Sequence, residues 1–518
     1  MNPRDNGKPR TDLQSARRDL ASKAINAAKW NYLGVAARIV IQLVAQIVLA
    51  RLVGASEFGY YSLVFMIVGI GYIAAEFGLS SALIQSREMT DANVRFVWTR
   101  MLISSIGGAI ALYLAADFLA ALLQMPEAVF YIQLAGIPLV IQLLSAVPLA
   151  LLRKNLDFKS IQFAQVSGML IGQVAVGFVL AWILHSALAI VIGWTVQLAI
   201  AWGIMYAKTR HTLRPSLSAP SAGLTKYGVG AWTANLANWG IENIHMLVAG
   251  RLFGAATLGY YSVSSNLVRY PTNHLVTTLQ SVMFPASAAA QDDPKGIAKA
   301  YLAVLGLVGL ITVPTFVACG LLAKELIVLL YGPSWVEAAL ILLPLALAMP
   351  LHSITAVSGP ILWGMGRVSR ESGLQWLTLG VFAITLWAVM PISVSALAWI
   401  VFAIFLFRAL SISVAVAATL RVPLRQLAAS LSGGLLLGLI AAGISLATRT
   451  VLGEAFPLTA ILVSVVIVVA LSSLLLWYFP RAIVSVPLAQ AITIAGKKLP
   501  TALTARLSSR VIGAASRD

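Results

Sequence analysis

Long apolar segments alternate with short polar connections along nearly the whole chain. A helix needs about 20 apolar residues to cross the hydrocarbon core of a bilayer. By this criterion the chain has fourteen candidate spans, and no connection is long enough for a soluble domain. We expect the spans to begin near Trp30, Gly59, Phe96, Val129, Ile161, Ala187, Tyr227, Leu258, Lys299, Val336, Ser372, Ala396, Leu427 and Pro457. The pattern predicts an all-α polytopic membrane protein with about 14 transmembrane helices.

The connections between these spans alternate between rich and poor in lysine and arginine. If the N-terminus is cytoplasmic, 28 of the 36 basic residues lie on the cytoplasmic side. Four lie on the opposite side: Arg51, Arg251, Lys324 and Arg449. Short cytoplasmic loops of membrane proteins carry an excess of positive charge. The polar N-terminal segment also lacks the apolar core of a signal peptide. We therefore expect both termini in the cytoplasm.

One phrase of the sequence occurs twice, 200 residues apart. The segment RLVGASEFGYYSL at 51–63 returns as RLFGAATLGYYSV at 251–263, with eight identical residues in 13. Background residue usage would give about one identity. Each copy lies between the first and second span of a six-span block, and because six is even, both blocks have the same orientation. We predict two parallel six-helix lobes followed by two C-terminal helices.

The duplication and the spans together divide the chain into six segments. These are a basic cytoplasmic tail (1–29), an N-lobe of six helices (30–207), a cytoplasmic inter-lobe loop (208–225), a C-lobe of six helices (226–425), two further helices (426–480) and a second basic cytoplasmic tail (481–518). Such repeats are common in transporters that rock one lobe against the other around a site at their interface. The architecture therefore favours a transporter that works by alternating access.

Several spans carry polar residues along one helix face. A charge at the centre of a span costs at least about 2.5–3.5 kcal/mol, so it usually faces a cavity or a partner. In the first span these residues are Arg38, Gln42 and Gln46; in the seventh they are Asn235, Asn238, Glu242 and His245; in the eighth they include Asn266, Arg269 and Asn273; and the second span contributes Glu76. Position 38 corresponds to position 238 at the 200-residue offset, and position 42 corresponds to position 242. Both lobes therefore carry polar residues on equivalent faces of their first helix.

We predict that these four spans surround a basic central cavity. Its candidate substrate-binding residues are Arg38, Gln42, Gln46, Asn235, Asn238, Asn266, Arg269 and Asn273; its ion-coupling candidates are Glu76, Glu242 and His245; and Arg51 and Arg251 lie at its outer mouth. The alternative is internal pairing, of Arg38 with Glu76 and of Glu242 with Arg269. Arg51 and Arg251 could equally be interfacial anchors. Arg408, on a largely apolar helix, could join the cavity or extend to the membrane surface.

Composition excludes several other classes of protein. The chain is 59% hydrophobic and 10% charged, with a net charge of +18 that is explained by membrane orientation rather than by nucleic-acid binding. With one cysteine, no disulfide within the chain and no cysteine cluster can form. The sequence has no Walker A loop and no HExxH motif. We predict no catalytic residues, no metal site and no cofactor.

Three segments resemble one family of transporters. LVGASEFGYYSLVFMIVGIGYIAAEFGLSSALIQ at 52–85 and RLFGAATLGYYSVSSNLVRYPTNHLVTTLQSVMFPASA at 251–288 resemble the second-helix regions of the polysaccharide transport family, and LYGPSWVEAALILLPLAL at 330–347 looks like that family's segment before its tenth helix. This family lies within the multidrug/oligosaccharidyl-lipid/polysaccharide flippase superfamily. The chain is most similar to its Wzx-type members of the colanic acid and succinoglycan kind.

The resemblance implies a function. Such flippases move an undecaprenyl-diphosphate-linked oligosaccharide from the inner to the outer leaflet of the bacterial inner membrane, for exopolysaccharide, capsule or O-antigen synthesis. The expected partners are this lipid-linked oligosaccharide, a polysaccharide polymerase and a chain-length regulator. Arg38 and Arg269 would receive the diphosphate. Glu76 and Glu242 would couple transport to a proton or sodium gradient, or would only pair with arginines. The last two helices would hold the polyprenyl tail or serve packing alone.

Three other functions compete with this prediction. A drug exporter of the same superfamily would favour an acidic, aromatic cavity, whereas here arginines equal or exceed acids within the spans. A polysaccharide polymerase or ligase would need a long periplasmic loop, and the predicted outer connections are short. A scaffold without transport activity would have little use for charges buried in the membrane.

Overall fold

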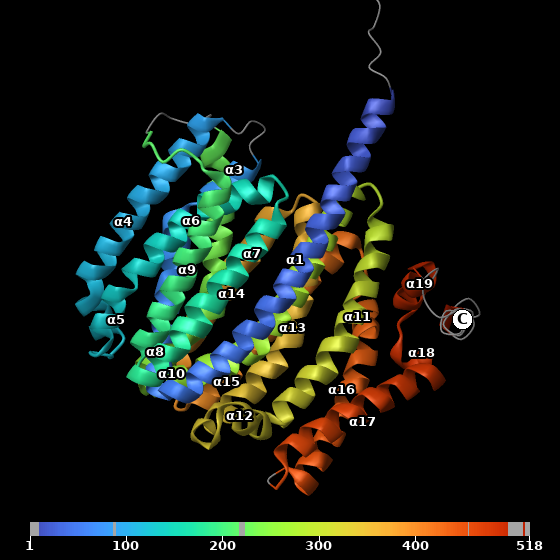
Figure 1. Cartoon of the computed structure of the whole chain (residues 1–518). Helices are drawn as coiled ribbons and strands as arrows, with labels where there is room; N and C mark the ends of the chain where they lie inside the picture. The colour runs from blue at the N-terminus through green and yellow to red at the C-terminus, as the bar shows by residue number, and fades with distance from the viewer. Residues whose placement is uncertain (1–9, 86–89, 217–222, 454, 496–510, 513–518) are drawn as a thin grey trace, which may run out of the picture. The chain divides into compact units, whose positions relative to one another are not determined.

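The structure is a computed structural model of the chain, and it describes residues 10–85, 90–216, 223–453, 455–495 and 511–512 (Figure 1). Within these ranges every regular element is a helix, and 12 helices are long and apolar enough to cross a membrane. One further element, α10 (Gly223–Ala289), consists of two helices joined at Gly254. The two halves of α10 occupy the positions predicted for the seventh and eighth spans. The predicted all-α polytopic fold is confirmed.

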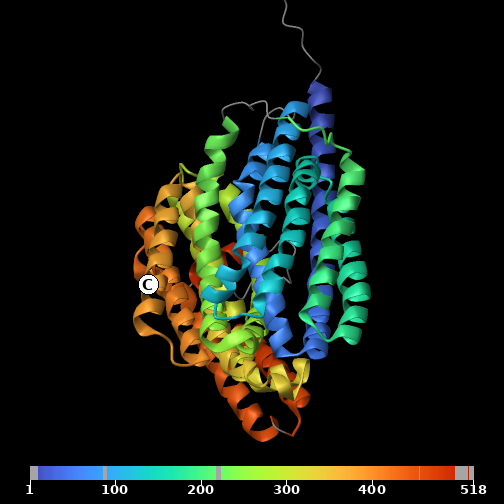
Figure 2. The same cartoon turned by 90° about the vertical axis from the view of Figure 1, so that its left-hand side faces the viewer.

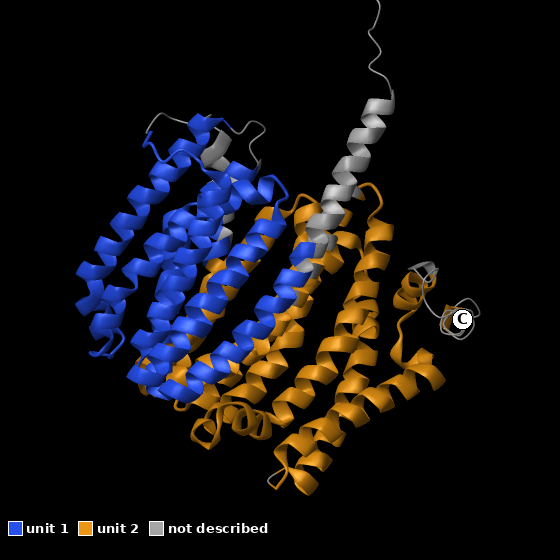
Figure 3. Cartoon of the chain, in the orientation of Figure 1, with its two compact units in different colours: residues 1–236 blue, residues 237–518 orange. Residues whose placement is uncertain are grey.

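The chain forms two compact units, 1–236 and 237–518, called here the N-unit and the C-unit (Figure 3). The N-unit contains the start of α10 and the elements α1 (Arg10–Val53), α2 (Ala55–Glu76), α3 (Leu79–Gln85), α4 (Asp91–Leu122), α5 (Ala128–Leu134), α6 (Gly136–Lys154), α7 (Phe158–Gly168), the π-helix η1 (Met169–Gly177), α8 (Phe178–Leu184) and α9 (Ala187–Thr209). The division between the units falls within α10, so the lobe boundaries proposed from the sequence stay a prediction.

The C-unit contains the rest of α10 and the remaining elements of the chain. They are α11 (Pro294–Leu321), α12 (Ala323–Tyr331), the short 3-10 helix η2 (Pro333–Trp335), α13 (Ala338–Gly364), α14 (Val368–Val389), α15 (Val394–Leu420), α16 (Leu424–Leu452), α17 (Pro457–Tyr478), α18 (Pro480–Ile483) and α19 (Val486–Ala495). Within each unit the long helices run alongside one another, as the two views of Figures 1 and 2 show.

The repeated phrase has the same backbone conformation in both units. Gly54 has φ 81° and ψ 176°, and Gly254 has φ 82° and ψ 179°. Only glycine adopts this region of φ and ψ without strain, because a Cβ atom would clash with the backbone. Each glycine ends one helix and starts the next, so the 200-residue repeat is a structural repeat as well as a sequence repeat.

Other residues of this phrase are buried within the N-unit. Gly59 lies buried within α2. Tyr60 is 6% exposed and donates a hydrogen bond to Glu127 Oε2 at 2.7 Å. Its ring stacks on that of Tyr131, with centroids 5.0 Å apart. Tyr60 therefore links the start of α2 to α5.

The fifth predicted span folds as α7, η1 and α8 in succession. Its π-helical part packs closely against α9 because glycines face each other across the contact. A Cβ atom at Gly172 would lie 2.3 Å from the backbone nitrogen of Gln197, and one at Gly193 would lie 2.8 Å from Gly177 Cα. Small residues permit such close packing of membrane helices. The close approach holds this span against α9.

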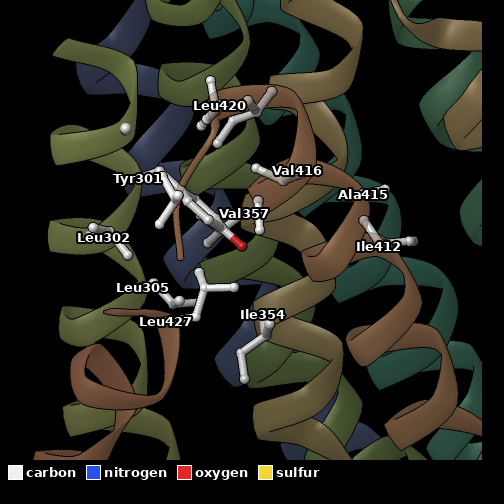
Figure 4. Packing of buried hydrophobic residues seen from close by; sticks show 14 of the residues in the cluster. Tyr301, Leu302, Leu305, Ile354, Val357, Ile412, Ala415, Val416, Leu420 and Leu427 are labelled. Carbon is white, nitrogen blue, oxygen red and sulfur yellow. The ribbon is translucent and has the colours of Figure 1, made fainter. Parts of the chain in front are cut away.

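An apolar cluster joins α11, α13, α15 and α16 in the C-unit (Figure 4). Tyr301, Val357 and Ile412 are fully buried in it. The hydroxyl of Tyr301 lies 3.0 Å from the Ser358 hydroxyl, so its polar end is satisfied within the cluster. This packing gives the C-unit a rigid core beside the polar residues of α10 and α15.

The segment predicted as a C-terminal tail, 481–518, begins with packed structure. Ile483, Val484 and Leu488 are each 3% exposed and form an apolar cluster with Leu437 of α16. A Cβ atom at Gly433 would clash with Ile483, so α16 and the α18 region touch backbone to backbone. The apolar residues of α18 and α19 form a run that is too short to cross a membrane, so the sequence alone did not distinguish this segment from a tail.

Candidate functional site

In the N-unit, the described residues form no ion pair with Arg38 of α1. Its Nε atom is buried and has no hydrogen-bond partner within the described ranges. The positive charge of Arg153, which lies exposed at the end of α6, acts on Arg38, although burial is the larger influence. Two guanidinium groups that act on each other are stabilised by an anion that both can reach. Arg38, together with Arg153, is therefore a candidate anion site. Arg153 was missed from sequence because it was counted as an orientation residue.

Glu76 does not pair with Arg38 in the part of the chain that the structure describes. Its carboxylate instead accepts hydrogen bonds from the backbone N–H groups of Gly78, at 2.7 Å, and Ser80, at 2.6 Å. These contacts hold the turn after α2 and satisfy N–H groups at the start of α3. The sequence alternative of an Arg38–Glu76 ion pair is therefore wrong, and an ion-coupling role for Glu76 stays a prediction.

The other N-unit candidates differ in accessibility. Gln42 is half-buried, whereas Gln46 is only 6% exposed and faces the interior of the unit. Asn235 of α10 is exposed, as is Arg51 in the last turn of α1. Arg38 and Gln42 are thus more accessible to a ligand than Gln46. The substrate-binding roles of all of these residues stay predictions.

In the C-unit, Arg269 and Glu242 form an ion pair between the two halves of α10. Arg269 Nη2 lies 2.6 Å from Glu242 Oε2, and Nη1 donates to the backbone carbonyl of Glu242 at 3.2 Å. The side chains are 21% and 26% exposed, so the pair is not sealed from its surroundings. This is the internal pairing that the sequence left open as an alternative to cavity lining.

Arg408 lies at the centre of a second polar network. It is 4% exposed, and its Nε donates to Gln375 Oε1 at 2.8 Å, while Nη2 donates to Asn238 Oδ1. Gln375 in turn donates to Glu371 Oε1 at 2.6 Å, and Trp363 donates to the other Glu371 oxygen. Arg408 therefore does not extend to the surface: it connects α10, α14 and α15.

Glu371 and Gln375 were missed from sequence. They are four residues apart on α14, so they share a helix face, and this spacing was the available signal. The sequence reading treated Glu371 as part of an inner loop because the eleventh span was expected to begin near Ser372. The structure instead places Glu371, 3% exposed, within the buried network.

A small cavity of about 10 Å³ adjoins the Arg269–Glu242 pair. Its polar lining is Glu242, His245, Ser265, Arg269 and His352. This volume is near the space that one water molecule needs. His245 is 2% exposed and packs against the rings of Tyr261 and Phe382. Three of the buried nitrogens that have no hydrogen-bond partner among the described residues belong to this cavity or to the Arg408 network: His245 Nδ1, His352 Nδ1 and Arg408 Nη1.

The remaining C-unit candidates lie outside this network. The side-chain amide nitrogen of Asn266 lies 3.4 Å from the Ser262 hydroxyl, and Asn273 is half-buried. Arg251 is exposed, as its counterpart Arg51 is. Within the described ranges no three histidine, cysteine or acidic side chains are grouped as metal ligands. The structure describes each unit by itself, so the cavity predicted between the lobes stays a prediction.

These features define a polytopic helical membrane protein with buried, paired charges, the class to which membrane transporters belong. Residues 48–340 match the model of the polysaccharide biosynthesis protein family, which is more than half of the chain. The chain belongs to this family, and the family resemblance drawn from its motifs is confirmed.

Individual relatives agree with this assignment. The chain is 25% identical over 352 residues to the lipopolysaccharide biosynthesis protein WzxC of Escherichia coli (strain K12), covering 67% of this chain and 71% of the relative. It is 23% identical over 340 residues to the succinoglycan biosynthesis transport protein ExoT of Rhizobium meliloti (strain 1021), covering 65% and 68%.

Two solved structures share the fold. The lipid II flippase MurJ, in an inward closed conformation, matches with a TM-score of 0.67 and 13% identity, covering 88% of this chain and all of that one. A multidrug resistance MATE family transporter of the MOP superfamily, facing inward, matches with a TM-score of 0.56 and 15% identity, covering 74% and 94%.

Proposed function

We propose that the protein is a flippase that moves undecaprenyl-diphosphate-linked oligosaccharide repeat units across the bacterial inner membrane. The relatives named for lipopolysaccharide and succinoglycan synthesis support the class of cargo. Both termini lie in the cytoplasm, as the distribution of basic residues favours. The protein acts by transport rather than by catalysis, and it supplies a polysaccharide polymerase and its chain-length regulator.

The observation that carries this proposal is the buried Nε of Arg38, which has no hydrogen-bond partner among the described residues. A diphosphate offers several oxygens to a guanidinium, and hydrogen bonds between charged groups are the strong ones. Binding an anion would satisfy this nitrogen and would also offset the positive charge of Arg153 that acts on Arg38. A drug exporter for organic cations would gain nothing from such a pair.

The transport cycle is alternating access, in which the lobes expose the bound cargo first to one leaflet and then to the other. The expected driving force is a proton or sodium gradient, with Glu76, Glu242 and His245 as the candidate coupling groups. Glu242 and His245 line the same small cavity in the C-unit. Their placement supports a coupling role without distinguishing between the two ions.

The test is chemical analysis of a strain from which the gene is deleted. The strain is expected to lose its surface polymer and to accumulate undecaprenyl-diphosphate-linked repeat units at the cytoplasmic face of the inner membrane. Lipid extraction and mass spectrometry measure the intermediate, and a plasmid copy of the gene should restore export. Normal turnover of the intermediate in the deletion strain would refute the proposal.

A further inference from the structure

Arg269 is a candidate for binding the cargo's diphosphate, yet in the structure it is already occupied. Its hydrogen bonds within the described ranges both go to Glu242, one to the carboxylate and one to the backbone carbonyl. A carboxylate and a phosphate present similar oxygen pairs to a guanidinium fork. The same nitrogens cannot hold both anions in that geometry. Glu242 therefore stands where an anionic ligand of Arg269 would bind.

The surroundings of Glu242 offer it a second cation. The charged and titratable groups that act on its carboxylate are Arg269 and His245 from α10, His352 from α13 and Arg408 from α15. Arg408 keeps two nitrogens on Gln375 and Asn238, but its buried Nη1 has no partner among the residues that the structure describes. Glu371 of α14 also acts on Arg408. A carboxylate released from Arg269 would therefore still be acted on by the positive charge of Arg408.

We propose that Glu242 is a placeholder for the diphosphate of the cargo. In the empty protein it neutralises Arg269, and in the loaded protein the diphosphate takes its place while Glu242 turns to Arg408. This inference rests on the proposed flippase function and adds a residue that sets cargo affinity. The arrangement solves a problem of alternating access, because an unpaired arginine within the membrane is costly in the empty protein as well as in the loaded one.

The pair is open enough for this exchange. The side chains of Arg269 and Glu242 are 21% and 26% exposed, whereas Arg408 is 4% exposed. Arg269 is therefore the more accessible of the two arginines to an anionic ligand. Arg408 serves as the fixed internal partner, held in place by its bonds to α10 and α14.

The experiment measures binding of undecaprenyl diphosphate to the purified full-length protein in nanodiscs, with undecaprenol as the ligand without phosphate. Glu242→Gln removes the competing charge at nearly constant volume. We expect it to bind undecaprenyl diphosphate about tenfold tighter than the wild type, a typical size for coupled binding, with no change for undecaprenol. Arg269→Ala should abolish this gain when combined with Glu242→Gln. Transport by Glu242→Gln should be slower, because the empty protein has lost its counter-ion.

Glu325→Gln is the matched control. Glu325 belongs to another glutamate–arginine pair of the C-unit, with Arg449 at 3.5 Å. The Glu325→Gln variant should leave the affinity for undecaprenyl diphosphate unchanged. Glu242→Asp is a second variant, in case Glu242→Gln does not fold. It keeps the negative charge on a shorter side chain, so it should increase the affinity for undecaprenyl diphosphate less than Glu242→Gln does. If both Glu242 variants bind like the wild type, or the gain persists without Arg269, the placeholder idea is wrong. If the wild type does not prefer undecaprenyl diphosphate to undecaprenol, the flippase proposal itself fails.

Discussion

Arg38 and Arg269 both lie on polar faces of predicted spans, yet they differ in what surrounds them. Arg38 Nε has no hydrogen-bond partner among the described residues and is acted on by the positive charge of Arg153, whereas Arg269 is held by Glu242. Helical spacing predicts which face a residue lies on. It does not predict the partner, because Arg153 and Glu242 come from other turns or other helices. The sequence offered the Arg269–Glu242 pair as an alternative, but it could not decide between pairing and cavity lining, and it wrongly offered Glu76 as a partner of Arg38.

Removing the charge of Arg38 should impair export. We expect Arg38→Ala to reduce polymer export by about tenfold or more, since a hydrogen bond to a charged group contributes roughly 1.5–3 kcal/mol. Arg153→Ala should act in the same direction. Export is measured as polymer yield in the complemented deletion strain, with protein level in membranes checked by immunoblot. Arg100→Ala, which removes an exposed arginine of α4, is the control and should export normally. Normal export by both Arg38→Ala and Arg153→Ala would contradict the assignment.

His211, in the connection after α9, should make stability depend on pH. Burial lowers the pKa of His211 from the ordinary value of 6.5 to about 4. The folded state therefore prefers the neutral ring, whereas the unfolded chain binds a proton below pH 6.5. The contribution of His211 to the free energy of unfolding is therefore fully present above pH 6.5 and is lost as the pH falls toward 4. The loss should reach roughly 1–2 kcal/mol by pH 5.

Thermal unfolding of the detergent-purified protein at pH 7 and pH 5 measures this effect. His211→Gln should show a smaller drop in unfolding temperature between the two pH values than the wild type, whatever its absolute stability. His185→Gln is the control, because His185 is exposed. An equal drop in His211→Gln and the wild type would argue against a role for the His211 ring.

At the scale of single elements, the two glycines of the repeated phrase should resist substitution equally. Gly54 and Gly254 lie at φ 81° and 82°, where any other residue is strained by about 1–3 kcal/mol. We expect Gly54→Ala and Gly254→Ala each to lower the unfolding temperature. Gly107→Ala, within α4 and with no atom near its would-be Cβ, is the control and should be neutral or slightly stabilising. A harmless substitution at either repeat glycine would contradict the strain argument.

Most helices could be predicted from sequence because a membrane span needs a long apolar run, and such runs are easy to recognise. Finer features could not. The π-helix Met169–Gly177 depends on contacts with α9 that only the folded unit supplies. The helices at Pro480–Ile483 and Val486–Ala495 are too short for a span, and only their burial against α16 distinguishes them from a tail.

At the scale of the whole molecule, the repeat predicts architecture better than chemistry. Gly54 and Gly254, 200 residues apart, have the same backbone conformation. The same offset aligns Arg38 with Asn238 and Gln42 with Glu242, so the polar residue types are not repeated. In the C-unit Asn238 accepts a hydrogen bond from Arg408, and Glu242 neutralises Arg269. Charge is thus balanced within the C-unit network, whereas Arg38 Nε in the N-unit has no hydrogen-bond partner among the described residues.

The predicted orientation can be tested on α11, whose two ends should face opposite sides of the membrane. Cys319 is the single cysteine of the chain, so a Cys319→Ala background accepts one new cysteine at a time. Lys295 lies exposed at the start of α11, and Ser334 lies exposed beyond its end. With the excess of basic residues in the cytoplasm, the start of α11 faces inward and its end faces outward.

A membrane-impermeant maleimide applied to spheroplasts should therefore label Ser334→Cys and leave Lys295→Cys unlabelled until the membrane is permeabilised. Labelling of both after permeabilisation shows that each thiol is reactive, which makes the comparison fair. The opposite pattern would invert the topology, and it would place the Arg38 and Arg153 pair nearer the outer leaflet. In that case a cargo built on the cytoplasmic face could not meet this pair first, and the direction of transport assigned to the protein would have to be reversed.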